Sequence, residues 1–210
     1  MGPMSDSAAD RRGPRFRRPA FTADAEQIAG AADPSAELEA AHRSAAALVR
    51  RATGRPDGEV AQRLGEFVAT EGITELAALW AHAPAASLPG ALYQLVLLRE
   101  WITRHPLEAA RFYSRGRQVA EVSDVVAGVA DPPTPDGVVA LANAVLSSAF
   151  DADLGDALDR AAAFCRVVSA GRAYDTPPDD ASTSRLAAGN LTMAENLAQS
   201  ARAWRADALE

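Results

Sequence analysis

The sequence predicts an all-α protein: a compact multi-helix bundle of about seven to eight helices, with a disordered N-terminal arm and a separate C-terminal helix. Alanine is the most abundant residue, and it is the best intrinsic helix former because it loses no side-chain entropy in a helix. Apolar residues recur at helical spacing in successive segments after residue 32. The sequence shows no pattern typical of strands, hairpins or glycine-rich turns.

The chain divides into four predicted parts. Residues 1–32 lack helical periodicity and are rich in Gly, Pro, Ala and charge, which is typical of a disordered basic arm. Residues 33–171 form the expected helical domain. The stretch "RAYDTPPDDASTS", residues 172–184, is interpreted as a linker. Residues 185–210 are expected to form a C-terminal amphipathic helix.

The first half of the helical domain has clear start and stop signals. Asp33 is the expected N-cap of the first helix, with Pro34 at its first position. Its inward face is expected to carry Leu38, Ala41, Ala45, Leu48 and Val49. A second helix is expected over 57–70, and a short third one follows that carries Ile73, Leu76, Ala77 and Trp80.

The helix after Ser87, its expected N-cap, is apolar nearly all round, which indicates a central position in the bundle. His105–Pro106 is expected to end or kink it. The valines between 119 and 129 fit a helical stripe, although their number leaves a strand open.

Two further helices close the predicted domain. Asp136 is expected to cap the first, and Asp151 or Asp153 the second. Gly171 is expected to end the second helix, because glycine is the usual residue just past a helix.

Charge is distributed unevenly along the chain. The net charge is −7, and all 21 basic residues are arginine. Residues 1–21 hold five arginines against two aspartates, which gives +3; the remaining residues hold 16 arginines against 26 acids, which gives −10. We therefore expect binding of nucleic acid or anionic lipid, if it occurs, to be local.

Candidate catalytic and metal-binding residues are lacking in the sequence. His42, His82 and His105 show no paired spacing of the kind that zinc ligands have. Cys165, the single cysteine, lies on an apolar helical stripe, so a packing role is expected. It allows no internal disulfide, which favours a reducing cytoplasm. The chain is therefore interpreted as a cytoplasmic non-enzyme with no metal, no cofactor and no membrane span.

Two clusters combine arginine with aromatic residues, a combination suited to phosphate contact and base stacking. Their alternative interpretations are a solvated leader for the first, and surface arginines paired with Glu100, Glu108 or Glu121 for the second. The first cluster, in the N-terminal arm, comprises Arg11, Arg12, Arg15, Phe16, Arg17, Arg18 and Phe21. The second comprises Arg104, Arg111, Tyr113, Arg115 and Arg117, and its members 104, 111 and 115 share one face if the helix is nearly continuous there.

The predicted C-terminal helix carries a narrow apolar stripe that includes Met193, Leu197 and Trp204. A narrow stripe with polar flanks suits packing onto another surface, so these residues are candidates for oligomerisation.

From "LWAHAPAASLPGALYQLVLLREWI" to "VVAGVADPPTPDGVVALANAVLSSAFDADLGDALDRAAAFCRVVSAG", the chain resembles a group of uncharacterised, all-helical actinobacterial proteins. The resemblance covers about residues 35–171. It implies a helical domain and a cytoplasmic, actinobacterial origin, and it implies neither an activity nor catalytic residues.

Three functions fit these patterns. The first is a non-enzymatic interaction or regulatory protein, whose acidic body presents a partner surface and whose basic arm contacts nucleic acid or an acidic protein partner. The second is a homodimeric protein–protein adaptor that uses the C-terminal helix. The third is a small-ligand binder or enzyme with a pocket between helices, lined by Trp80, Tyr93 and Trp101.

Overall fold

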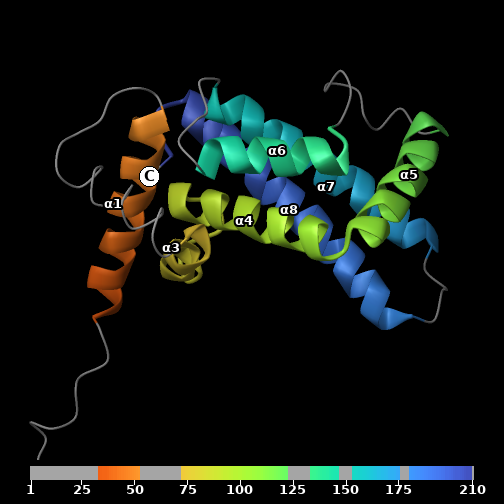
Figure 1. Cartoon of the computed structure of the whole chain (residues 1–210), viewed down its shortest axis with the longest axis horizontal. Coiled ribbons are helices and arrows are strands. Elements are labelled where there is room, and N and C mark those ends of the chain that lie inside the picture. The colour runs from red at the N-terminus through yellow and green to blue at the C-terminus, as the bar shows by residue number, and fades with distance from the viewer. Residues whose placement is uncertain (1–32, 53–71, 123–132, 147–152, 176–179, 210) are drawn as a thin grey trace, which may run out of the picture. The chain divides into compact units, whose positions relative to one another are not determined.

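The computed structural model describes residues 33–52, 72–122, 133–146, 153–175 and 180–209. These residues form seven helices and no strand, which confirms the predicted all-α bundle (Figure 1). The helices are α1 (Pro34–Ala52), α3 (Ile73–Trp80), α4 (Leu88–Arg104), α5 (Pro106–Val122), α6 (Pro135–Leu146), α7 (Leu154–Asp175) and α8 (Ala181–Arg205). None of them is long and apolar enough to cross a membrane.

Helix α4 is the centre of the described bundle, as its all-round apolar sequence predicts. It contacts α1, α3, α5, α6 and α8. In Figure 1, α4 and α6 run side by side, and α7 and α8 form a second pair in contact with them. Ser87 caps α4 as expected: its Oγ accepts a hydrogen bond from the backbone N–H of Gly90 at 3.3 Å. The cap satisfies one of the amide groups left free by the first turn.

Two further helix boundaries lie where the sequence predicts them. Asp153 caps α7, since its Oδ1 accepts from the backbone N–H of Asp156 at 3.1 Å. The backbone breaks at His105, between the end of α4 and the start of α5 at Pro106. The predicted cap of α6, Asp136, is wrong. Thr134 has that role, accepting from the N–H of Gly137 at 3.2 Å, because Pro135 already occupies the first helical position.

The predicted end of α7 at Gly171 is also wrong, because the helix continues to Asp175. Gly171 instead allows α5 and α7 to approach closely. A Cβ atom at Gly171 would lie 1.9 Å from the carbonyl oxygen of Phe112, and one at Gly116 would lie 1.8 Å from that of Val167. Both positions therefore need glycine for packing.

The predicted linker over 172–184 is shorter in the structure. Helix α7 covers its first four residues, and α8 begins at Ala181. The carboxylate of Asp180 caps α8, accepting from the backbone N–H groups of Ser182 and Thr183 at 2.9 and 3.2 Å. Both hydroxyls donate to it as well, and these hydrogen bonds lower the pKa of Asp180.

The C-terminal helix is a distinct helix, and α7 is its main neighbour within the same compact unit, Pro34–Glu210. Ser169 donates a hydrogen bond to the carbonyl oxygen of Ala187, and Arg205 near the end of α8 binds Asp156 and Asp159 near the start of α7. The two helices are therefore antiparallel.

The core is aliphatic, with few large side chains. Trp80 and Phe164 are the largest of the fully buried ones. The indole N–H of Trp80 donates to Ser44 Oγ at 3.0 Å, which satisfies its buried polar atom. Cys165 is fully buried, as its place on the apolar stripe predicts, and burial raises the pKa of its thiol to about 12. The helix predicted over 57–70, the valines from 123 to 129 and the N-terminal arm lie outside the described residues.

Candidate interaction surface

Two arginines on one face of α5 share a single carboxylate at the end of α7. Arg111 Nε lies 3.4 Å from Asp175 Oδ2, and Arg115 Nε lies 3.4 Å from Asp175 Oδ1. The arginine side chains are 61% and 48% exposed, whereas the aspartate is 21% exposed. Two guanidinium groups and one carboxylate leave a local charge of +1 on a chain whose net charge is −7.

Two exposed apolar side chains lie next to this pair. Tyr174, 65% exposed, precedes Asp175 in α7, and the guanidinium carbon of Arg115 is 6.0 Å from the centre of its ring. Leu107, 87% exposed, lies one helical turn before Arg111. We call Leu107, Arg111, Arg115, Tyr174 and Asp175 the arginine surface.

A buried arginine holds the end of α7 against α4 and α5 beneath this surface. Arg172 is 5% exposed, and its guanidinium carbon lies 5.0 Å from the ring centre of Trp101 and 4.3 Å from that of Phe112. Its Nη2 forms an ion pair with Glu108 at 3.2 Å. Burial lowers the pKa of Arg172, and the Glu108 carboxylate opposes that shift. Cation–π contacts and an ion pair thus fix the backbone from which Tyr174 and Asp175 project.

The remaining members of the second predicted cluster lie elsewhere. Arg104 belongs to α4, beyond the break at His105, so the continuous face predicted for Arg104, Arg111 and Arg115 does not form. Arg104 Nη2 pairs with Glu100 at 3.1 Å, as the alternative interpretation of this cluster expects.

Tyr113 is part of the interior, since its ring stacks on that of Phe164 at 5.7 Å between centres. Arg117 is half-buried on α5. The arm residues Arg11, Arg12, Arg15, Phe16, Arg17, Arg18 and Phe21 lie outside the described residues.

The three residues predicted to mediate oligomerisation pack against the core of their own chain. Leu197 is fully buried in the core, and Met193 and Trp204 are partly buried against it. The narrow stripe of α8 therefore packs within the chain, mainly on α7.

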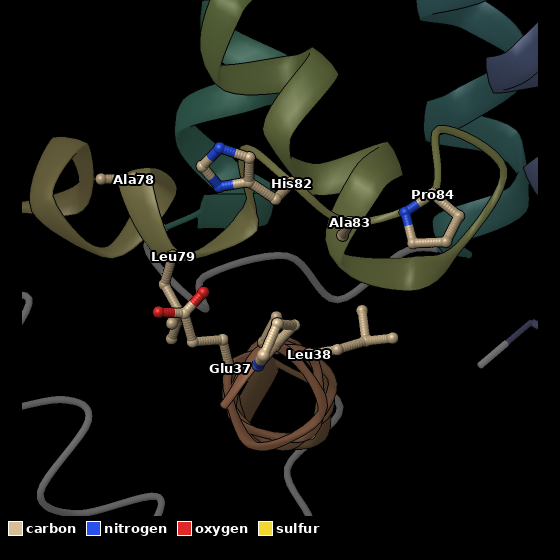
Figure 2. A pocket seen from close by; sticks show the side chains of 9 residues that line it. Glu37, Leu38, Ala78, Leu79, His82, Ala83 and Pro84 are labelled. Atoms are coloured by element: carbon tan, nitrogen blue, oxygen red, sulfur yellow. The ribbon is translucent and has the colours of Figure 1, made fainter. Parts of the chain in front are cut away.

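The aromatic residues expected to line a pocket are core residues. Trp80 is fully buried, and Tyr93 and Trp101 pack against the core. A groove of about 660 Å³ lies instead between α1 and the end of α3 (Figure 2). Its polar side chains among the described residues are Glu37 and His82, and Figure 2 shows the Glu37 carboxylate reaching toward α3.

The wall of this groove includes Leu38 and Leu79, which are exposed. Leu38 was predicted to be inward, but only the other four members of that α1 face are buried. Two polar groups on a mostly apolar wall do not make the convergent polar set typical of a small-molecule site. The part of the chain that the structure describes has no group of three or more His, Cys, Asp and Glu placed to hold a metal ion.

Sequence reasoning missed Arg172, Tyr174 and Asp175, because they fall in the predicted linker. Position 172 continues the spacing of Cys165 and Val168 on α7. This spacing could have shown that the helix extends beyond Gly171.

Comparisons of the chain with protein-family models, with curated proteins and with solved structures found no match. The resemblance to actinobacterial helical proteins stays a prediction.

Proposed function

We propose that the protein is a non-enzymatic interaction protein whose arginine surface binds an acidic segment of a protein partner. The ratio of two exposed arginines to one carboxylate carries this proposal. An arginine that is fully paired within its own chain gains little from a second anion, whereas Arg111 and Arg115 share a single carboxylate between them and retain the capacity to bind a carboxylate of a partner.

The neighbours of the two arginines favour a protein over a nucleic acid. Tyrosine and arginine are enriched in the central residues of protein interfaces. Exposed Leu107 offers an apolar contact with no counterpart in a phosphate backbone. The chain after residue 21 has a net charge of −10, which repels an extended polyanion more than a short acidic peptide.

On this proposal, the N-terminal arm also binds the acidic partner through arginine and aromatic side chains. Its five arginines, Arg11, Arg12, Arg15, Arg17 and Arg18, add a second basic contact for the partner, and Phe16 and Phe21 add apolar anchors. Cys165 does not act as a nucleophile in this function, because it is buried and its thiol pKa is raised to about 12.

A binding titration tests the proposal. Fluorescence anisotropy of a labelled oligoglutamate peptide is measured with wild-type protein and with Arg111→Ala/Arg115→Ala. Loss of two charge-assisted contacts is expected to weaken binding by roughly tenfold or more, about 1.4 kcal/mol, and added salt is expected to weaken wild-type binding. The matched control is Arg160→Ala/Arg202→Ala, which removes the same charge from exposed positions on α7 and α8.

Three results would overturn parts of the proposal. Equal affinity of the two double variants would remove the arginine surface from the mechanism. Tighter binding of a labelled oligothymidylate than of oligoglutamate would assign the surface to single-stranded nucleic acid. Unchanged affinity on deletion of residues 1–21 would leave the arm without a role.

A further inference from the structure

We infer that Asp175 occupies the anion-binding position of the arginine surface in the free protein, and that a carboxylate of the partner displaces it. This inference rests on the proposed function and adds its regulation: the protein carries its own competitor for the acidic ligand. The ligand group is a carboxylate of an acidic peptide.

The position of Asp175 is that of a bound anion. Its two carboxylate oxygens each approach one guanidinium, Oδ2 toward Arg111 and Oδ1 toward Arg115, at the same distance of 3.4 Å. A carboxylate bridging two arginines in this way is the arrangement expected of a ligand carboxylate. Both arginines are exposed enough for a ligand to reach them.

Asp175 is held loosely. Charge-assisted hydrogen bonds between nitrogen and oxygen measure about 2.7–2.9 Å, so both of its contacts are long. Glu100 on α4 is a useful comparison within this chain, because it also lies between two arginines. Its Oε1 is 2.6 Å from Arg99 Nη1 and its Oε2 is 3.1 Å from Arg104 Nη2. Of these two bridging carboxylates, Asp175 is therefore the easier one to displace.

The helix also disfavours a carboxylate at this position. Asp175 is the last residue of α7, where the helix macrodipole presents its negative end. The local field therefore opposes the Asp175 charge while the two arginines attract it. An Asp175→Asn substitution removes both effects, so we expect folding stability close to that of the wild type.

Displacement requires only a side-chain rotation. Arg172, three residues earlier, is fixed between Trp101 and Phe112 and paired with Glu108, so the end of α7 stays in place. Asp175 has two rotatable side-chain bonds and can turn toward solvent without unwinding the helix. Arg111 and Arg115 then bind the incoming carboxylate.

The expected effect follows from competition. When the site is free for only a fraction of the time, the apparent dissociation constant exceeds the intrinsic one by the inverse of that fraction. Two exposed ion pairs of ordinary strength correspond to roughly a threefold to tenfold effect. Asp175→Asn is therefore expected to bind oligoglutamate roughly threefold to tenfold more tightly than the wild type.

The control variant must remove one negative charge, as Asp175→Asn does, at a position outside the arginine surface. Glu195→Gln does so: Glu195 is exposed on α8, about 20 Å along that helix from the end nearest Asp175. This distance is about twice the screening length at physiological salt. Glu195→Gln is expected to bind oligoglutamate like the wild type.

Affinities of the wild type, Asp175→Asn, Glu195→Gln and Arg111→Ala/Arg115→Ala for labelled oligoglutamate decide the matter. An increase confined to Asp175→Asn supports displacement. An equal increase in both single variants, or none in Asp175→Asn, overturns it while the proposed function stands. Wild-type affinity in the double arginine variant overturns the proposed function itself.

A second measurement avoids any variant. Carboxyl-carbon NMR of the wild-type protein follows Asp175 directly while unlabelled oligoglutamate is added. Displacement is expected to move the Asp175 resonance toward that of a solvated aspartate. A resonance that stays fixed while the peptide binds would overturn the inference.

Discussion

Gly171→Ala is expected to destabilise the protein, because the added methyl group meets backbone atoms of the neighbouring helix. Its Cβ would lie 1.9 Å from the Phe112 carbonyl oxygen, 2.8 Å from the Phe112 carbonyl carbon and 2.9 Å from the Gly116 nitrogen. Separations under 3.0 Å are essentially never seen for a real Cβ, so α5 and α7 must move apart by about 1.1 Å at this point. Backbone atoms of a helix cannot rotate out of the way as a flexible side chain can.

The magnitude combines two opposing effects. Overpacking costs typically 1–3 kcal/mol. We take the upper value, about 3 kcal/mol, because the clash is with backbone atoms, which cannot rotate aside. Alanine in a helix interior is better than glycine by about 1 kcal/mol. The expected net loss in the free energy of unfolding is therefore about 2 kcal/mol, which lowers Tm by about 4–8 °C for a chain of this size.

Gly189→Ala is the matched control. Gly189 lies inside α8, and nothing is within 4 Å of the position that its Cβ would take. The same substitution is therefore expected to stabilise the protein by about 0.5–1 kcal/mol. Urea unfolding followed by far-ultraviolet circular dichroism measures both variants. If Gly171→Ala is as stable as the wild type, or if both variants shift in the same direction, the close approach of α5 and α7 is refuted.

Two further predictions concern titratable groups. Hydrogen bonds in the folded state lower the pKa of Asp180, so its cap contributes stability above the ordinary aspartate pKa of about 3.9 and loses it as pH falls below that value. The stability difference between the wild type and Asp180→Ala is expected to be full at pH 7 and to narrow below about pH 4 in urea titrations; a constant difference would contradict this. The Cys165 thiol, with a pKa of about 12, is expected to resist a disulfide reagent at pH 8 in folded protein and to react fully in urea. Rapid modification of folded protein would show that Cys165 is accessible.

Much of the fold was predictable because local chemistry determines where these helices begin and end. Ser87 and Asp153 cap helices as their positions suggest, and Pro106 separates α4 from α5. One error was local, since Thr134 and not Asp136 caps α6, and another arose where tertiary packing overrides a local signal. Glycine often ends a helix, which is why Gly171 was expected to end α7. Its role is instead to leave room for the carbonyl group of Phe112, which is distant in sequence.

The candidate site was predictable only in part, for a related reason. Arg111 and Arg115 were found because they stand close together in one helix. The end of α7 was missed because Arg172 occupies the next position of a buried stripe, and a charged residue there is normally the first one outside the core. Two aromatic rings and Glu108 compensate for its burial, and all three come from other helices.

The two ends of α7 differ in local charge, so the net charge of the chain alone does not predict where the proposed binding surface lies. At its start, one arginine is shared by two carboxylates: Arg205 lies 2.7 Å from Asp156 and 2.8 Å from Asp159. At its end the ratio is reversed, since Arg111 and Arg115 share Asp175. The two clusters are about 25 Å apart along the helix, more than twice the screening length of about 8–10 Å. The two clusters are therefore electrostatically almost independent, and on the proposed function an acidic segment is expected to approach the arginine surface although the chain is acidic as a whole.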